Sequence, residues 1–428
     1  MKKFILTIIK SINIIICFTY SIAKLLININ IIRKAQVVVL LPDGGFGHTI
    51  TGPDITRKVY KGQRCVFIVF SEYRRHNWKV SLIWTDIEVI FLPLSIGTKY
   101  RVFGKALVFP WAYWYREGVP NIVKNIFKLL NASCNIHYVN EIYGNLQLPN
   151  EIGKDESKPG GLNNFGHSWP TGYFKLSEKV FAPNVYLPNS LQRDIENKIL
   201  NYLPEEKKDK IKLCCLYLRQ KGLEEKDDAS NYTRSGSNFE DYIMAIKKLN
   251  NSGYIVLLTG DVVPSLLKMK EFNGMLIDNR LIKIDKNLFY IYAATNSDIF
   301  IGEPGGGAWL PNVNNILKLI INAFPFSYGL PNSWVYYKTV RDRNGNLMKF
   351  EKLLSDYSYH YNFEEFGFNL YNNSADEIYR AVSSFIEDIN KPVEYNPGAD
   401  IVSKISNYSW LKISKAKISP EWLRLYSV

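Results

Sequence analysis

The stretch at residues 298–311, DIFIGEPGGGAWLP, decides the fold. Its apolar run at residues 299–302 predicts a short buried strand, because such a run is bounded directly by turn residues. Glu303-Pro304 and the three glycines that follow predict a turn into a helix that opens at Ala308. A strand that leads through a glycine turn into a helix is typical of α/β proteins with a parallel sheet.

The glycine turn also predicts a ligand site, with Gly305, Gly306 and Gly307 as its backbone. Glycines let a ligand approach the main chain closely, and N–H groups at a helix start attract anions such as phosphate. Glu303 is expected at the mouth of the turn, where its carboxylate would accept hydrogen bonds from hydroxyl groups. This combination favours a phosphorylated, hydroxyl-rich ligand such as a nucleotide sugar. The alternative is a tight turn whose glycines serve steric fit only, since the motif is neither a P-loop nor a full G-x-G-x-x-G.

Length and composition limit the number of domains and the classes of partner that this chain can have. A chain of 428 residues with 46% hydrophobic and 14% aromatic residues is expected to form two packed domains. The formal net charge of +13 is compatible with nucleic acid, an anionic membrane face or an anionic substrate. Basic and acidic residues are mixed along the chain, as at residues 205–210, which favours a diffuse basic surface over a nucleic-acid-binding arm. We therefore expect no nucleic-acid partner.

The cysteines and histidines indicate neither a disulfide framework nor a metal centre. The chain has five cysteines, and the odd count with the adjacent pair Cys214-Cys215 argues against paired disulfides. Cys65, Cys214 and Cys215 lie in strand-like runs and are expected in the core. No spacing of cysteine or histidine matches a metal site, so we expect neither metal nor other cofactor.

The N-terminal segment poses a targeting question. Residues 4–32 are strongly apolar but are interrupted by Lys10 and Lys24, and the uncharged stretch between these lysines is shorter than a spanning helix needs. An interfacial helix on the cytoplasmic side of the inner membrane is favoured, and a true span with snorkelling lysines is the next choice. In either case the segment is expected to lie outside the globular core.

Strands and helices alternate along the rest of the chain. Predicted strands at residues 37–41, 65–70 and 89–94 form a first α/β set, and strands at residues 213–218, 254–259, 299–302 and 317–322 form a second. Helices are expected at residues 49–60, 239–251, 287–296 and 374–388, the last with Ser374 and Glu377 as a capping box. The predicted organisation is an apolar helix (1–34), a first domain (35–205), a second domain (206–390) and a tail that packs back on the domains (391–428).

Three further places carry candidate functional side chains at predicted strand ends. Gly45, Gly47 and His48 follow the first strand, and a histidine there could act as a general base or merely hydrogen-bond the turn. Arg219 follows the strand at residues 213–218, and Arg234 precedes the next helix. Either guanidinium could hold a diphosphate or form a structural ion pair.

Asp261 follows Gly260 at the end of the strand at residues 254–259. Its carboxylate could accept a hydrogen bond from a ligand hydroxyl, or it could cap the helix that follows. The sequence favours neither role.

The order of these motifs resembles a family of bacterial glycosyltransferases from surface-polysaccharide gene clusters. The resemblance rests on Arg219, the N-Y-x-R segment that ends at Arg234, Tyr242, the G-Y-x-V-x-x-x-G-D segment that ends at Asp261, and F-I-G-x-x-G-G at residues 300–306. The G-x-G-H turn that ends at His48 and the segment at residues 418–423 are also similar. Glu303-Pro304 is a departure, since family members more often carry small or hydroxylated residues there.

The resemblance implies a GT-B type enzyme, with two Rossmann-like domains and a cleft between them. It implies transfer of a sugar from a nucleotide-sugar donor to a surface glycan or a lipid-linked acceptor, without a bound metal. The donor would be held by Arg219, Arg234, Asp261 and the turn at residues 303–307, and the acceptor would lie near Gly45, Gly47 and the catalytic base His48. Two alternatives stay open, a nucleotide-sugar epimerase of the same fold and a non-catalytic binding protein of a polysaccharide-assembly complex.

Overall fold

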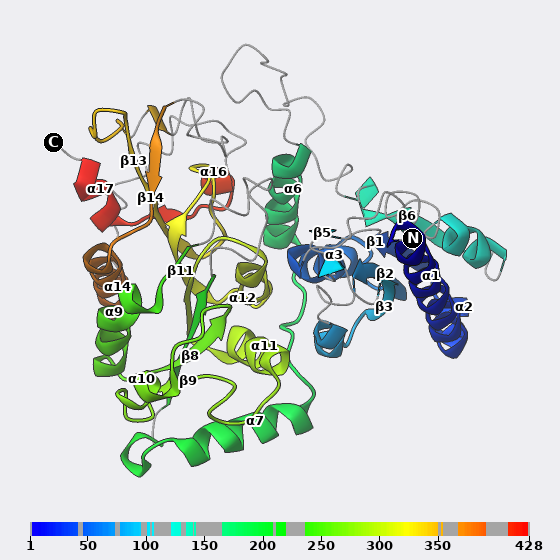
Figure 1. Cartoon of the computed structure of the whole chain (residues 1–428), viewed down its shortest axis with the longest axis horizontal. Helices are drawn as coiled ribbons and strands as arrows, with labels where there is room; N and C mark the ends of the chain where they lie inside the picture. The colour runs from blue at the N-terminus through cyan, green and yellow to red at the C-terminus, as the bar shows by residue number, and fades with distance from the viewer. Residues whose placement is uncertain are drawn as a thin grey trace. The chain divides into compact units, whose positions relative to one another are not determined.

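The computed structural model describes residues 2–41, 46–72, 78–95, 101–102, 105–106, 121–129, 134–139, 141–142, 165–208, 211–219, 236–349, 352–353, 367–390 and 410–426. The chain forms two compact units. The first comprises Met1–Leu146 and Leu176–Val185, and the second comprises Gln147–Lys175 and Tyr186–Val428. Figure 1 shows the course of the chain through both units.

The first unit is built on a parallel sheet of four strands in the order β3-β2-β1-β6. Its strands are β1 (Val37–Leu41), β2 (Cys65–Glu72), β3 (Glu88–Ser95) and β6 (Asn135–Tyr138). Its other described elements are helix α3 (Phe46–Val59), the 3-10 helix η1 (Trp78–Ile83), a helix at residues 121–129, and the antiparallel pair β4 (Arg101–Val102) and β5 (Lys105–Ala106). The core lies on the sheet, where Val38, Leu40, Val66 and Ile68 pack with Phe127.

Helix α3 begins earlier than the sequence predicts. The sequence predicts a helix at residues 49–60, yet the helix begins at Phe46 and includes Pro53. A proline within a helix removes one main-chain hydrogen bond. The side chain of Thr51 donates to the carbonyl of Gly47 at 3.1 Å, and that of Thr56 to the carbonyl of Gly52 at 2.8 Å.

The N-terminal helices belong to the first unit. Helix α1 (Lys2–Ile27) packs against β3, and α2 (Ile29–Arg33) carries Ile32 into the core cluster of the sheet. Cys17 and Ser21 on α1 are buried. The expectation that this segment lies outside the core is therefore wrong for its C-terminal half. Among the helices of the described residues, none combines the length and apolar character needed to cross a membrane.

The second unit is built on a parallel sheet of seven strands in the order β15-β12-β11-β10-β7-β8-β9. Its strands are β7 (Lys212–Leu218), β8 (Tyr254–Gly260), β9 (Leu276–Ile277), β10 (Ile299–Gly302), β11 (Leu317–Ala323), β12 (Ser333–Tyr337) and β15 (Lys417–Ile418). Numbered from the first strand of the unit, the six strands from the edge strand β9 to β12 follow the order 3-2-1-4-5-6, which is that of a Rossmann fold. The first sheet has the 3-2-1-4 part of this order. The predicted fold class, α/β with two Rossmann-like units, is confirmed.

Helices cover both faces of the second sheet. Helices α9 (Phe239–Asn251) and α14 (Ala375–Asn390) lie side by side on one face, and α11 (Lys286–Asn296) packs on β7 and β8 from the other (Figure 1). The remaining described elements are α6 (Phe165–Lys179), α7 (Asn189–Tyr202), η2 (Glu205–Lys207), α10 (Leu266–Lys270), η3 (Gly306–Ala308), α12 (Trp309–Val313), α16 (Trp410–Ile413), α17 (Pro420–Tyr426), and the antiparallel pair β13 (Thr339–Arg341) and β14 (Asn369–Tyr371).

The capping box of α14 is confirmed. The backbone N–H of Glu377 donates to the hydroxyl of Ser374 at 3.3 Å, and the backbone N–H of Ser374 donates to the Glu377 carboxylate at 2.7 Å. The predicted core cysteines are also confirmed, since Cys65, Cys214 and Cys215 are buried and free.

The unit boundary differs from the one predicted at residue 205. Helix α7, placed by the sequence in the first domain, belongs to the second unit, where it contacts α11. The C-terminal segment also lies in the second unit, because β15 extends its sheet beside β12 and Trp422 packs on Phe326 and Tyr337.

Candidate functional site

In the second sheet, the side to which successive strands are added reverses between β7 and β10. From β7 the chain proceeds to β8 and β9 on one side, and from β10 it proceeds to β11 and β12 on the other. Ligands of open α/β sheets bind at such a switch point, outside the carboxyl ends of the strands. Arg219 follows the last residue of β7, and Glu303 follows the last residue of β10. The two residues that the sequence singled out after these strands therefore flank one switch point.

Arg219 is held across this switch point by two hydrogen bonds. Its backbone N–H donates to Glu303 Oε2 at 2.9 Å, and its Nη1 donates to the carbonyl of Pro304 at 3.1 Å. A Cβ added to Gly305 would lie 2.8 Å from Nη1 of Arg219, and Gly305 has a φ of +143°. The guanidinium thus rests over Gly305, and a glycine is required there both for space and for backbone conformation.

Glu303 lies inside the protein instead of at the mouth of the turn. Its exposed fraction is 0%, and its carboxylate accepts from Asn322 Nδ2 at 2.9 Å and from the Ser237 hydroxyl, in addition to the N–H of Arg219. Burial raises the pKa of the Glu303 carboxyl, while these hydrogen bonds and the charge of Lys338 act in the opposite direction. The sequence prediction of a solvent-facing carboxylate is wrong, because three protein donors occupy its two oxygens.

The Glu303 network ties four parts of the second unit together. Ser237 precedes α9, and its hydroxyl oxygen accepts from the Tyr242 hydroxyl within α9 at 3.2 Å, because its single proton goes to Glu303. Asn322 lies in β11 with a φ of +53°, and its backbone and side chain exchange hydrogen bonds with Asn373 at 2.8 and 2.6 Å. The carboxylate therefore joins the end of β7, the start of α9 and the end of β11 around the first residue after β10.

Sequence reasoning did not assign roles to Ser237, Asn322 and Asn373. A polar residue within the apolar run at residues 317–323 was the available signal for Asn322. Ser237 and Asn373 lie far from Glu303 in the sequence, so only the folded chain reveals that they belong to the same network.

The glycine turn is packed mainly by protein atoms. A Cβ at Gly307 would lie 2.4 Å from the ring of Tyr217, and the Tyr290 hydroxyl donates to the carbonyl of Gly307 at 2.7 Å. Gly305 and Gly307 are buried, whereas Gly306 is half-buried. The helix expected after Ala308 is the 3-10 turn η3 followed by the five-residue α12, which is too short to provide a helix-start anion site. Steric fit therefore explains Gly305 and Gly307.

Asp261 lies beside Arg219 at the same sheet edge. Its backbone N–H donates to the carbonyl of Leu218 at 2.8 Å, and its half-exposed carboxylate lies 3.5 Å from Lys286 Nζ. Gly260 before it has a φ of +96° and passes against the Leu218 carbonyl. The helix that follows, α10, is capped by Ser265, so Asp261 does not serve as its cap.

In the first unit, Gly47 and His48 lie in the first turn of α3, directly after the end of β1. Both are half-buried. β1 has β2 on one side and β6 on the other, so it flanks the corresponding switch point of this sheet. Gly45, like Arg234 of the second unit, lies outside the described residues.

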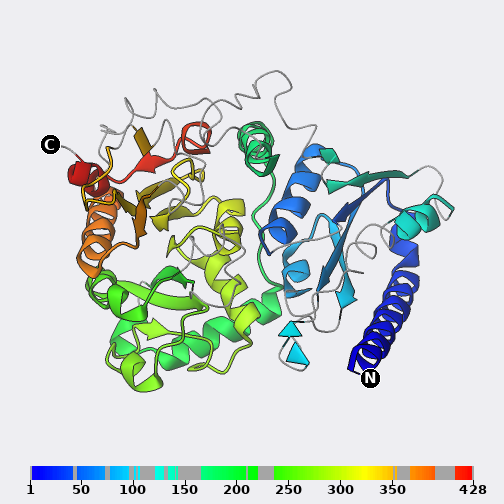
Figure 2. The same cartoon turned by 45° about the horizontal axis from the view of Figure 1, so that its top comes forward.

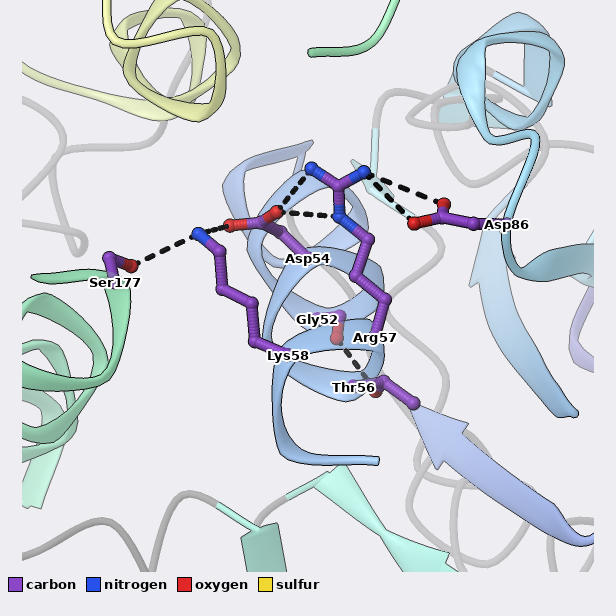
Figure 3. Close-up of polar contacts among 7 residues, drawn as sticks. All are labelled: Gly52, Asp54, Thr56, Arg57, Lys58, Asp86 and Ser177. Atoms are coloured by element: carbon purple, nitrogen blue, oxygen red, sulfur yellow. Dashed lines mark hydrogen bonds and ion pairs between the residues drawn. The ribbon is translucent and has the colours of Figure 1, made fainter. Parts of the chain in front are cut away.

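The C-terminal half of α3 is anchored by a buried ionic network (Figure 3). Asp54 is fully buried and pairs with Arg57 Nη2 at 2.7 Å and with Lys58 Nζ at 2.5 Å. Arg57 also contacts Asp86, which precedes β3, at 3.3 Å, and Lys58 donates to Ser177 of α6 at 3.0 Å. The network contains two acidic and two basic side chains, so its formal charges cancel. It connects the helix that carries His48 to Asp86, just before β3, and to Ser177 of the same unit.

Comparisons with known proteins place glycosyltransferases among the similar solved structures. The sequence matches no protein-family model and no curated protein. A family 9 glycosyl transferase from Veillonella parvula has a TM-score of 0.42 and 10% identity, over 71% of this chain and 86% of that one. The E. coli heptosyltransferase WaaC with ADP-2-deoxy-2-fluoro heptose has a TM-score of 0.35 and 12% identity, over 70% and 92% of the two chains.

The E. coli ADP-heptose lps heptosyltransferase II has a TM-score of 0.36 and 10% identity, over 67% of this chain and 84% of that one. All three TM-scores are below 0.5. Any function of this chain must therefore rest on its own residues.

Proposed function

We propose that this chain is a glycosyltransferase that moves a sugar from a nucleotide-sugar donor to a surface glycan or a lipid-linked acceptor. The observation that carries the proposal is the switch point of the second sheet, where Arg219 is fixed across the ends of β7 and β10. A guanidinium keeps its charge at all relevant pH values and can bind a phosphate through two parallel hydrogen bonds. The motif resemblance around residues 219–306 supports the same activity.

In this proposal the second unit holds the donor. Arg219 and Arg234 contact the diphosphate and stabilise the charge that develops on the leaving group, so no metal is required. Asp261, at the neighbouring strand end, accepts a hydrogen bond from a donor hydroxyl, and the half-buried Gly306 allows close approach to the backbone. Glu303 acts as a positioning residue, because it holds the backbone of Arg219 and does not contact the ligand.

The first unit presents the acceptor. His48 lies in the first turn of α3, next to Gly47, and it is the proposed base that removes the proton from the acceptor hydroxyl. Gly45, which lies outside the described residues, is proposed to lie on the acceptor side as well.

The decisive experiment is calorimetric titration of the full chain with a panel of nucleoside diphosphates and nucleotide sugars. Arg219→Ala should weaken donor binding by about 1.5–3 kcal/mol, the scale of a charged hydrogen bond, and Arg234→Ala should act similarly. A matched control is Arg341→Ala, since Arg341 also donates to one backbone carbonyl, that of Gly345 at 2.8 Å, but lies in β13. Its loss should leave donor binding unchanged.

Three outcomes would contradict the proposal. Unchanged donor affinity in a folded Arg219→Ala variant would remove the donor site from this edge. Release of an altered nucleotide sugar without any acceptor would identify an epimerase. The absence of any thermal shift with the nucleotide panel would favour a non-catalytic binding protein.

A further inference from the structure

Helix α1 has two faces of different character. One face packs on the first unit, where α1 contacts β3, Cys17 and Ser21 are buried, and Leu25 adds to the core cluster. This face anchors the helix to the body of the unit. Figure 2 shows α1, in dark blue, as one long helix at the edge of the first unit.

The opposite face exposes large apolar side chains at helical spacing. Ile15 is 62% exposed and Ile27 is 82% exposed. The exposed large apolar residues of this face are Ile12, Ile15, Ile16, Tyr20, Ile22, Leu26 and Ile27. The other exposed positions described between residues 12 and 27 are Thr19 and Ala23, so these exposed positions carry no charge. Lys24 is half-buried, and its Nζ lies 5.9 Å from the centroid of the Tyr20 ring, which places one base at the border of the face. Contiguous exposed apolar surface of this kind marks an interaction site.

Every charged residue in the segment that contains α1 and α2 is basic. Residues 1–42 contain the bases Lys2, Lys3, Lys10, Lys24, Arg33 and Lys34 and no aspartate or glutamate. Arg33 and Lys34, just beyond the end of α1, are exposed. A segment with an uncharged apolar face and only basic residues complements an anionic bilayer, whose acyl boundary receives apolar side chains and whose headgroups attract lysine and arginine.

We propose that the exposed face of α1 seats this protein on the surface of an anionic lipid bilayer, with the helix lying in the plane of the interface. The face containing Cys17 and Ser21 stays bound to the first unit. The proposal is independent of the glycosyltransferase activity proposed above, because it rests on α1 alone. It assigns the docking role to a helix that is part of the folded unit.

Vesicle co-sedimentation of the full chain tests this docking. The vesicles are of mixed phosphatidylglycerol and phosphatidylethanolamine, with phosphatidylcholine vesicles for comparison. A triple variant, Ile15→Gln, Leu26→Gln and Ile27→Gln, should bind the anionic vesicles at least about tenfold more weakly, because its apolar contribution is lost. The matched control, Leu129→Gln, Phe181→Gln and Leu267→Gln, changes three side chains that are 87%, 78% and 77% exposed elsewhere. It should bind like the parent.

A charge variant, Arg33→Gln with Lys34→Gln, should lower binding to anionic vesicles by about tenfold and leave binding to phosphatidylcholine unchanged. Circular dichroism and thermal melting establish that each variant is folded. Equal loss in the control triple variant, or no binding of the parent to anionic vesicles, would overturn the proposal. So would light scattering that shows a dimer of the parent and a monomer of the α1 triple variant, because a second copy of the chain would then cover the face.

Discussion

The two units bury charge in different ways. In the first unit, Asp54 lies between Arg57 and Lys58 within 2.7 Å of both, and Asp86 completes a balanced set. In the second unit, Glu303 is satisfied by a hydroxyl, an amide and a backbone N–H. Lys318 of β11 is fully buried and donates to the carbonyl of Ile316 at 2.6 Å.

The comparison shows that a buried charged side chain can serve two different purposes. A buried charge with opposite charges around it can fix an element in place, as the Asp54 network does for α3. A buried charge held by neutral groups has a shifted pKa instead. Burial raises the pKa of Glu303 and lowers the pKa of Lys318 to about 7. The first arrangement supports a helix that carries a candidate base. In the second, Glu303 lies at the candidate donor edge and Lys318 near the amino end of β11.

The largest expected effect is on turnover. If the Asp54 network holds α3 so that His48 can act as a base, His48→Ala should reduce turnover by roughly 10²–10⁴ while donor affinity is preserved. Turnover is measured per folded molecule, with calorimetry for donor binding and thermal melting for stability on one preparation. A histidine that only hydrogen-bonds its turn would instead show lower stability and nearly normal turnover.

The next effect is on stability. Asp54→Asn should lower the free energy of unfolding by about 3–5 kcal/mol, because Lys58 would be left buried without a counter-charge and Arg57 would keep only the partly exposed Asp86. Urea titration measures this change. Asp86→Asn is the control, since the side chain of Asp86 is 33% exposed, and its loss should cost less than about 1 kcal/mol. Equal costs for the two variants would show that burial does not set the value of the network.

Glu303→Gln tests the arrangement in which a buried carboxylate accepts hydrogen bonds from a hydroxyl, an amide and a backbone N–H. The side-chain amide has one acceptor oxygen, so its NH₂ group must face a donor, either Arg219 N–H or the Ser237 and Asn322 pair. The free energy of unfolding should fall by about 1–3 kcal/mol, and donor affinity should fall with it if Glu303 positions Arg219. Asp261→Asn, at the same edge but half-exposed, should leave stability nearly unchanged. A Glu303→Gln variant with parental stability would mean that the carboxylate charge is not needed.

Lys318→Met should have the smallest effect, with a sign that depends on pH. Between pH 7 and about 10 the unfolded chain carries a proton on Lys318 and the folded chain does not, so the free energy of unfolding of the parent rises with pH in this window. The variant lacks this contribution. It should be more stable than the parent by about 1–2 kcal/mol at pH 7, because relief from burying the amine outweighs the loss of the hydrogen bond to the Ile316 carbonyl. Toward pH 10 the first contribution vanishes, so the variant should become less stable than the parent. Urea titrations at both pH values measure it, and a constant difference would contradict a lowered pKa.

The sequence by itself determined seven strands of the two parallel sheets, their α/β order and the residues at their ends. Apolar runs such as residues 37–41 and 299–302 are strands in the structure because buried parallel strands need apolar side chains on both faces. The capping box at Ser374 was also predictable, since its two hydrogen bonds link residues only three positions apart. Arg219 and Asp261 lie at strand ends as predicted, because local pattern sets where a strand stops.

Only the tertiary structure decided what these residues contact. Glu303 faces the interior because Ser237, Asn322 and the Arg219 N–H, all distant in sequence, converge on it. Gly305 and Gly307 are glycines because Arg219 and Tyr217 lie against them, which no local pattern encodes. Helix α1 is part of the first unit because β3 offers it a surface, although its apolar composition alone indicated a separate segment. Local sequence propensity allows several environments for such a residue, and contacts with residues distant in the sequence determine which one it has.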